Sequence, residues 1–352
     1  MKGRFAPSPT GYIHLGNVWI ALLSYISTRQ QQGGTYVVRM EDIDLQRSKR
    51  ELGEVLLDDL EWLGFDWDEG PPRVGGPLSS YWQSERQGYY AAVLDRLSLD
   101  RRVYPCFCNR TRLQSIASAP HLDEAVHRYD GYCRYLSSEK IDLLRAEKEP
   151  SLRLAVDNCE MHFMDLWQGS QNIRLVGELD DYVLRRGDGM YAYNLAVVLD
   201  DIAMGISEVI RGDDLLDTTG GQQLYLYKTL KESYQFDFKE LVQHFGIRSD
   251  NLKTSDMAYD TSPIVIPSYG HAPLLIDKDG YRLSKRQKSI TVRELRQQEW
   301  SPERILGELV VQCGLLSETS LPSRKISLKQ LLNIDLDISA LCRKTVVVDC
   351  VG

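Results

Sequence analysis

His14 and Gly16 follow a turn rich in proline and glycine near the start of the chain, RFAPSPTGYIHLGN (residues 4–17). We expect a helix to begin here, and a helix N-terminus presents unpaired N–H groups and a positive dipole end to anions such as a triphosphate. The imidazole of His14 can donate a hydrogen bond to a phosphate oxygen during displacement at phosphorus. Glycine at position 16 allows a flat base to approach the backbone. A simple turn that carries a surface histidine explains the segment equally well.

A second candidate lies about 270 residues further on, in DGYRLSKRQKS (residues 279–289). Ser284, Lys285 and Arg286 stand together in this basic segment, where they could close on phosphates. Taken alone, the segment is more typical of a solvated basic turn. HLGN and LSKR on either side of an α/β pattern form a far more specific combination than either one alone.

Three of the seven cysteines lie between residues 106 and 133. The C-x-C pair Cys106 and Cys108, with Cys133 downstream, suits a tetrahedral zinc site because thiolates favour zinc. His127, Tyr129 or water could supply a fourth ligand, and three reduced structural cysteines are the alternative. The other cysteines have no partner at metal-ligand spacing, so we expect core or surface thiols at Cys159, Cys313, Cys342 and Cys350.

The chain has 352 residues, 43% of them hydrophobic and 26% charged, which is typical of a globular protein with two or three domains. Its net charge of -8 argues against a large nucleic-acid-binding surface, so any RNA contact must use a local patch. Residues 101–134 offer one, with six arginines against three acidic residues. No signal peptide or apolar membrane span is evident, so we expect a cytoplasmic protein without membrane contact.

The elements that must position these residues follow an α/β pattern. Residues 2–6 and 35–41 read as strands around a helix at 16–31, which makes a βαβ unit that binds ligands at the carboxyl ends of its strands. The other expected elements are helices at 49–63, 191–203 and 302–316, strands at 182–186 and 207–212, and an irregular loop region at 234–270.

RFAPSPTG-xx-HLGN together with RLSKR resembles the glutamyl branch of the class I aminoacyl-tRNA synthetases, over about residues 3 to 316. HLGN stands at the HIGH signature of that family, with Asn17 in place of its last histidine, and LSKR stands at KMSKS. The resemblance implies that an amino-acid carboxylate attacks the α-phosphate of ATP, with Mg²⁺, before the aminoacyl group passes to RNA. It gives catalytic roles to His14 and Lys285 and ATP contacts to His14, Gly16, Asn17, Ser284, Lys285 and Arg286.

Two arginines and one carboxylate would complement glutamate, which has two carboxylates and one ammonium group. The resemblance places the amino acid at Arg4, Phe5, Ala6, Pro7, Ser8, Glu41, Tyr193 and Arg211. A neutral glutamine side chain would leave one buried arginine unpaired. Which arginine takes which carboxylate stays open, and the alternative role for Arg211 is a structural ion pair with Asp213 or Asp214.

C-x-C followed by Y-x-x-x-C resembles one subgroup, the glutamyl-queuosine tRNA(Asp) synthetases. That resemblance makes Cys106, Cys108, Tyr129 and Cys133 the ligands of one structural zinc, with His127 as the fallback. Only 66 residues follow Arg286, so we expect no large anticodon-binding region. The subgroup implies a monomer that activates glutamate without tRNA and transfers it to the queuosine base in the anticodon of tRNA(Asp). The alternatives are a shortened enzyme that charges the 3′ end of tRNA(Glu) and a non-catalytic RNA-binding paralogue.

The fold predicted in this way is a Rossmann-type α/β parallel-sheet catalytic domain with a zinc-containing α/β insertion and a short helical C-terminal extension. We place the two halves of the catalytic domain at 1–99 and 176–240, around an acceptor-stem-like insertion at 100–175. A connecting region with the LSKR loop follows at 241–295, and a helical stub at 296–352. Residues 247–268 and the tail after 317 are longer than the family pattern suggests.

Overall fold

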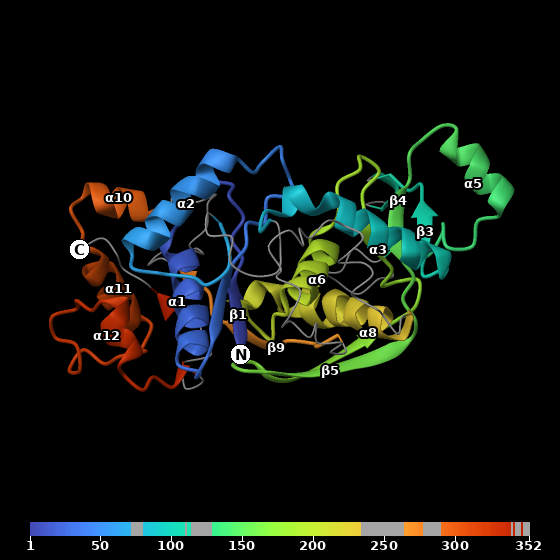
Figure 1. Ribbon diagram of the computed structural model, residues 1–352. Coiled ribbons are helices and arrows are strands. Elements are labelled where there is room, and N and C mark those ends of the chain that lie inside the picture. Colours follow the sequence, from blue (N-terminus) through green and yellow to red (C-terminus); the bar gives the residue numbers. More distant parts are fainter. Residues whose placement is uncertain are drawn as a thin grey trace, which may run out of the picture.

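The computed structural model describes residues 1–71, 80–109, 111–113, 129–233, 264–276, 290–338, 341 and 346–347. Its largest sheet has six strands in the order β2-β1-β8-β9-β5-β6 (Figure 1). All neighbours pair in parallel except β6, which runs antiparallel to β5 at one edge. The strands are β1 (Lys2–Phe5), β2 (Thr35–Val38), β5 (Cys159–Asp165), β6 (Gly169–Leu175), β8 (Glu208–Gly212) and β9 (Ser268–Ala272).

The predicted βαβ unit is confirmed at the N-terminus. β1 and β2 pair in register from Lys2↔Thr35 to Phe5↔Val38, and α1 (Leu15–Arg29) connects them. Most side chains of α1 are buried, because the sheet packs on the helix on one side and α12 contacts it as well. Gly33 has φ +71°, a left-handed conformation that glycine adopts without strain, which lets the chain reverse into β2.

Helices cover the opposite face of the sheet as well. α6 (Tyr193–Met204) and α8 (Leu224–Ser233) contribute Met204 and Leu224 to a buried cluster with Val37, Val209 and Tyr269 from the strands. The predicted helix at 191–203 and strand at 207–212 are thus confirmed as α6 and β8. The result is the helix–sheet–helix layering of a Rossmann-type domain.

The expected loop at 234–270 is wrong at its C-terminal end, because residues 268–272 form β9 in the interior of the sheet. Residues 234–263 lie outside the described part of the chain. β9 has the sequence SYGHA, which contains no valine, isoleucine or threonine. Pairing with β8 on one side and β5 on the other stabilises it in spite of this weak β-propensity.

Two sheets include strands from both sides of residue 175, where we expect a domain boundary. The hairpin of β5 and β6 extends the large sheet. A smaller antiparallel sheet joins β3 (Val103–Cys106), β4 (Ser151–Leu154) and β7 (Tyr182–Arg185). Local alternation predicts a strand but not its partner strand.

A second hydrophobic core lies between this small sheet and α3 (Gln87–Leu99), α6 and α8. α5 (Ser138–Arg145) has no buried residue and lies at the far end of this half of the molecule (Figure 1). The helical turns between β8 and α8 bend the chain back over the sheet. The remaining elements of this part are the 3₁₀ turns η1 (Gln83–Arg86) and η2 (Asp213–Leu215), the short α7 (Leu216–Thr218) and the π-helical turn η3 (Thr219–Gln223).

The C-terminal segment packs against the start of the chain. α10 (Val292–Gln297), α11 (Pro302–Gln312) and α12 (Leu328–Leu332) lie beside α1 and α2 (Arg50–Trp62) in Figure 1, and all contribute to one core. The Trp167 indole N–H donates to the carbonyl oxygen of Ile338 (2.7 Å). β10 (Leu275–Ile276) pairs in parallel with β11 (Val346–Val347). The expected stub at 296–352 therefore shares a core with the N-terminal half. No helix in the described ranges is long and apolar enough to span a membrane.

Candidate active site

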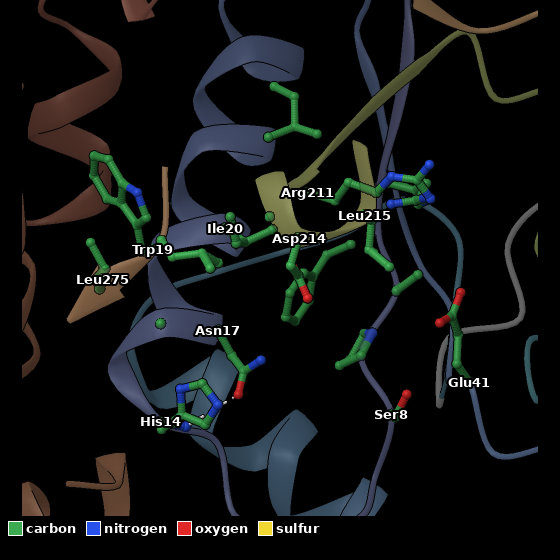
Figure 2. Close-up of a pocket in the computed structure, with 18 of the residues that line it drawn as sticks. Ser8, His14, Asn17, Trp19, Ile20, Glu41, Arg211, Asp214, Leu215 and Leu275 are labelled. Carbon is green, nitrogen blue, oxygen red and sulfur yellow. Dashed lines mark hydrogen bonds between the residues drawn. The ribbon is translucent and has the colours of Figure 1, made fainter. Parts of the chain in front are cut away.

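A cavity of about 430 Å³ lies where β1, β2 and β8 end and α1 begins (Figure 2). Every described residue that we predicted to contact glutamate or ATP lines this cavity. These residues are Arg4, Phe5, Ala6, Pro7, Ser8, His14, Gly16, Asn17, Glu41, Tyr193 and Arg211. Ser284, Lys285 and Arg286 lie outside the described residues, so their predicted roles stay predictions.

Arg4 and Glu41 form one side of the cavity and belong to a buried network of charges. Arg39 donates to Asp201 (2.6 Å) and to Glu41 (3.1 Å), and Arg4 Nε lies 3.4 Å from Asp201 Oδ1. Asp200 pairs with Arg86 (2.6 Å) below this group. Each carboxylate in the network thus has a cation beside it, which buried charges require.

The network shifts the pKa values of both cavity residues. Burial alone would lower the pKa of the Arg4 guanidinium, but the Asp201 carboxylate reverses this and holds the pKa above its ordinary value. Burial raises the pKa of the Glu41 carboxyl, and the Arg39 and Arg4 guanidinium groups partly counteract this rise. The neighbouring cations therefore limit the cost of holding a carboxylate at Glu41.

Arg211 comes from β8, the strand next to β1 in the sheet, and is held by neutral groups. Its Nε donates to His271 Nε2 (3.1 Å), its Nη1 to the Tyr193 hydroxyl (3.3 Å) and its Nη2 to Gln223 Oε1 (2.7 Å). Nη2 also donates to the Thr219 hydroxyl. In the described part of the chain Arg211 forms no ion pair, so the alternative of a structural pair with Asp213 or Asp214 does not account for it. Asp214 nonetheless lines the cavity.

His14 and Asn17 stand at the first turn of α1, across the cavity from Arg211 and Glu41 in Figure 2. The Asn17 side-chain oxygen accepts from the backbone N–H of His14 (3.4 Å). The backbone of His14 also bridges to Thr291 at the start of α10. The helix N-terminus thus faces a cavity whose other side carries charged groups, which is a suitable arrangement for a phosphate donor.

Several residues at this site were not predicted from the sequence. His271, Thr219 and Gln223 bond to Arg211, Asp165 bonds to His271, and all four are buried. The sequence offered little signal for them, because His271 lies in SYGHA, which shows no clear strand pattern. Apolar residues that complete the lining include Trp19, Ile20, Leu56, Ile210, Leu215, Pro273, Leu274 and Leu275.

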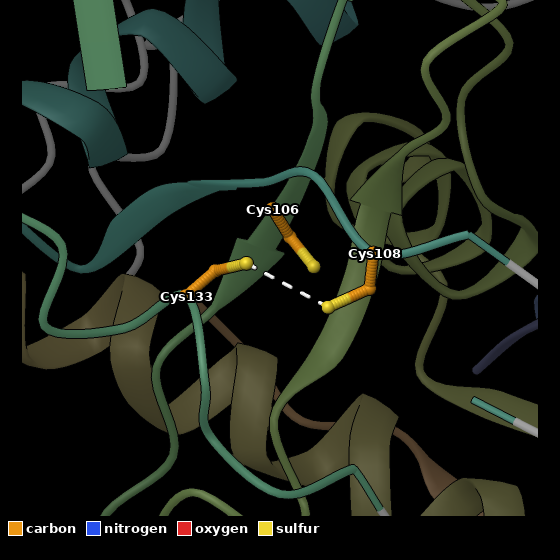
Figure 3. Close-up of side chains that lie close together, drawn as sticks. All are labelled: Cys106, Cys108 and Cys133. Atoms are coloured by element: carbon orange, nitrogen blue, oxygen red, sulfur yellow. Dashed lines mark hydrogen bonds between the residues drawn. The ribbon is translucent and has the colours of Figure 1, made fainter. Parts of the chain in front are cut away.

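The predicted cysteine cluster also assembles, in the loops after β3 (Figure 3). The three thiol sulfurs of Cys106, Cys108 and Cys133 lie within 4.8 Å of one another, with 3.6 Å between Cys108 and Cys133. The Tyr129 hydroxyl lies 3.6 Å from Cys106 Sγ and accepts from the backbone N–H of Cys133 (2.8 Å). His127 is outside the described residues.

These separations fit the donor set of a tetrahedral zinc ion. Zn–S bonds of about 2.3 Å and Zn–O bonds of about 2.0 Å place two sulfurs about 3.8 Å apart and a sulfur and an oxygen about 3.5 Å apart. Arg112 donates to Cys108 Sγ (3.3 Å), and the Arg153 guanidinium lies 4.0 Å from the centre of the Tyr129 ring. Both cations favour ionised ligands. Hydrogen bonds from the other two thiols lower the pKa of Cys106, and the hydrogen bonds with Cys106 and Cys133 raise the pKa of Cys108.

Residues 1–246 match the family model described as tRNA synthetases class I (E and Q), catalytic domain. The chain belongs to this family. It is therefore a ligase of the class I tRNA synthetase type, as the HLGN motif predicted. Two curated relatives are each named Glutamyl-Q tRNA(Asp) synthetase. The one from Symbiobacterium thermophilum is 41% identical over 90% of this chain and 87% of its own length, and the one from Nitratidesulfovibrio vulgaris is 41% identical over 90% and 88%.

A further relative is named Glutamate--tRNA ligase and comes from Sulfurihydrogenibium sp. It is 35% identical over 87% of this chain, which spans 57% of that protein. Among solved structures, the glutamate tRNA ligase from Elizabethkingia meningosepticum, in complex with its amino acid, superimposes with a TM-score of 0.76 at 23% identity. The match covers 99% of this chain and 67% of that one, and it supports the fold.

Proposed function

We propose that the protein activates L-glutamate with ATP and transfers the glutamate to the queuosine base in the anticodon of tRNA(Asp). The observation that carries the first half is the convergence of Arg4, Glu41 and Arg211 on one cavity. Glutamate brings two carboxylates and one ammonium group, and these three side chains offer the complementary charges. Glutamine in the same cavity would leave one guanidinium without its carboxylate, and this difference supports selection of glutamate.

Activation needs positioning and charge stabilisation rather than a covalent enzyme intermediate. An oxygen of the substrate's α-carboxylate bonds to the α-phosphorus of ATP, and the bond between that phosphorus and the pyrophosphate oxygen breaks. The N-terminus of α1, with His14, Gly16 and Asn17, is placed to bind the phosphates while charge moves to the leaving pyrophosphate. Lys285 and Arg286 would add positive charge from the LSKR segment. Mg²⁺, when bound with ATP, would neutralise phosphate charge.

The acceptor is proposed from the relatives. Two proteins named Glutamyl-Q tRNA(Asp) synthetase align with 90% of this chain at higher identity than the proteins named Glutamate--tRNA ligase in the same comparison. The assembled cysteine cluster supports the same assignment, because its Tyr129 and three cysteines follow the pattern of that subgroup.

The acceptor can be tested by incorporation of labelled glutamate into tRNA with and without queuosine. We expect label in queuosine-containing tRNA(Asp), and we expect the label to persist when the 3′-terminal nucleotide has been removed. Equal labelling of tRNA(Asp) that lacks queuosine would contradict the proposed acceptor. Label in tRNA(Glu) that disappears with the 3′-terminal nucleotide would instead identify a tRNA(Glu)-charging enzyme.

We further propose that Cys106, Cys108, Cys133 and Tyr129 hold one structural zinc ion. A closed four-ligand site would tie the C-x-C loop after β3 to residues 129–133 and stabilise this part of the insertion. The ion would supply no chemistry to the cavity, which is built from other elements.

Metal analysis of purified protein tests this site. We expect one zinc per chain, with a large loss in Cys133→Ser and a smaller loss in Tyr129→Phe, because a water molecule can replace the phenolate. Cys159→Ser is the matched control, because Cys159 lies on β5 outside the cluster. Wild-type zinc content in Cys133→Ser would refute the ligand assignment.

A further inference from the structure

His271 lies on β9, the strand next to that of Arg211, and Asp165 lies on β5, one strand further along the sheet. Arg211 on β8 lies opposite His271 on β9, and Asp165 ends β5 on the other side of β9. The exposed fractions of Arg211, His271 and Asp165 are 4%, 0% and 2%. Parallel pairing of three strands therefore brings a guanidinium, an imidazole and a carboxylate into one buried row.

The hydrogen bonds of this row assign its protons. Asp165 accepts from the backbone N–H groups of His271 (3.1 Å), Trp167 (3.0 Å) and Gln168 (2.9 Å), which favours its ionised form. A carboxylate only accepts, so the 2.6 Å contact to His271 Nδ1 places a proton on that nitrogen. An arginine only donates, so His271 Nε2, which lies 3.1 Å from Arg211 Nε, must be the acceptor. Both contacts require the same neutral tautomer, in which Nε2 can also accept from the Thr219 hydroxyl, 2.8 Å away.

We propose that the Asp165–His271 pair positions Arg211 for the substrate's carboxylate, with a neutral imidazole between the Asp165 carboxylate and the guanidinium. His271 fixes Nε, while Thr219 and Gln223 fix Nη2, so the plane of the guanidinium is set. A carboxylate in direct contact with Arg211 would compete with the substrate, whereas an imidazole nitrogen orients the group and leaves its charge uncompensated at the cavity. This inference rests on the proposed function, because it requires glutamate to bind at Arg211.

The row also predicts a pH dependence. The charged groups that face His271 are Asp165 from β5, Arg211 from β8 and Asp214 from η2, and the Tyr269 ring stacks on it within β9. Burial lowers the pKa of His271 below its ordinary value of 6.5, and the hydrogen bond to Asp165 partly offsets this. Protonation would remove the acceptor and put a second cation against Arg211. The KM for glutamate should therefore rise as the pH falls through the lowered pKa.

The experiment is glutamate-dependent pyrophosphate exchange between pH 5 and 8, assayed with and without tRNA, for wild type, His271→Leu and His271→Gln. Leucine removes the acceptor, so we expect the KM for glutamate to rise about tenfold or more while the KM for ATP stays within about twofold. Glutamine places an amide oxygen near the position of Nε2, so it should recover most of the affinity but show a flat pH profile. His162→Gln is the matched control, because His162 is an exposed histidine on β5.

An unchanged KM for glutamate in a folded His271→Leu variant would overturn the inference. If that variant does not fold, the dependence of the KM for glutamate on pH provides the test. A dependence in His271→Gln identical to that of wild type would also overturn the inference. Wild-type protein without any glutamate-dependent exchange would instead overturn the proposed function, and this inference with it. If wild type is active but the His271 variants keep its KM for glutamate, the positioning role is refuted and the proposed function stands.

Discussion

The two arginines that line the cavity are held in different ways. Arg4 lies beside the carboxylate of Asp201, inside a network that also contains Arg39 and Glu41. Arg211 has no such partner among the described residues and is held by an imidazole, two hydroxyls and an amide. The charge of Arg4 is thus balanced before any ligand binds, whereas Arg211 is separated from the Asp165 carboxylate by His271.

This difference predicts that the network around Arg4 serves folding stability and that Arg211 serves recognition of the substrate. The network around Arg4 is a closed set of buried charges, where removal of one member leaves another unpaired at a high cost in folding free energy. Arg211 has no ion-pair partner among the described residues. A substrate carboxylate should therefore gain more binding free energy at Arg211 than at Arg4. We expect substitutions in the charge network around Arg4 to act chiefly on stability. Substitutions around Arg211 should act chiefly on glutamate binding.

The largest expected effect is that of Arg211→Gln on glutamate activation. Loss of a buried cation that pairs with the substrate should lower kcat/KM for glutamate by about 10³, or about 4 kcal/mol. Arg4→Gln should cost about tenfold less in kcat/KM, because Asp201 already shares the charge of Arg4. Steady-state pyrophosphate exchange measures kcat/KM for both variants. Equal losses of kcat/KM would contradict the proposed difference between Arg4 and Arg211.

Asp201→Asn should produce the next largest effect, on stability. It leaves Arg4 and Arg39 without their shared carboxylate, and we expect the free energy of unfolding to fall by about 3 kcal/mol. Asp188→Asn, which removes a half-exposed pair with Arg186, should change it by less than about 1 kcal/mol. Denaturant titration of both variants provides the comparison. A similar loss of unfolding free energy in the two would show that the buried network contributes no more to stability than a half-exposed ion pair.

Thr219→Val should have the smallest effect and should act on binding. It removes one hydroxyl acceptor from Arg211 with little change in shape, so the KM for glutamate should rise about fivefold, or about 1 kcal/mol. Thr229→Val is the control, because the Thr229 hydroxyl is equally buried but bonds only to the carbonyl of Tyr225 in α8. A similar rise in both variants would argue against a specific role for Thr219.

Sequence patterns predicted the elements that carry the cavity. The βαβ unit, α2, α6, β8 and α11 follow from hydrophobic periodicity together with glycine and capping signals near their ends. The motif residues from Arg4 to Asn17 then lie together because one strand-to-helix turn contains them. Motif resemblance located Glu41, Tyr193 and Arg211, whose positions along the chain give no such hint.

The elements that were missed depend on contacts between distant segments. β9 carries glycine and histidine in a five-residue strand, and only its two neighbours make it a strand. Asp165 sits in a hairpin whose alternation fixes its own pairing but not which sheet it joins. The support of Arg211 by His271 and Asp165 therefore requires two strand pairings, β8 with β9 and β9 with β5, that no local pattern encodes. The expected domain boundaries, the cytoplasmic location and the monomeric state stay predictions.

The order of strands in the large sheet has a consequence for synthesis of the protein. β8 and β9 complete a sheet that begins with β1 and β2, yet His271 follows Arg4 by more than 260 residues. At translation rates of about 5–20 residues per second, the ribosome needs roughly ten seconds to a minute to deliver the second part. Until then the nascent β1 edge has no β8 to pair with, and such an edge can recruit other strands. The β1 edge therefore stays open to other strands for that interval.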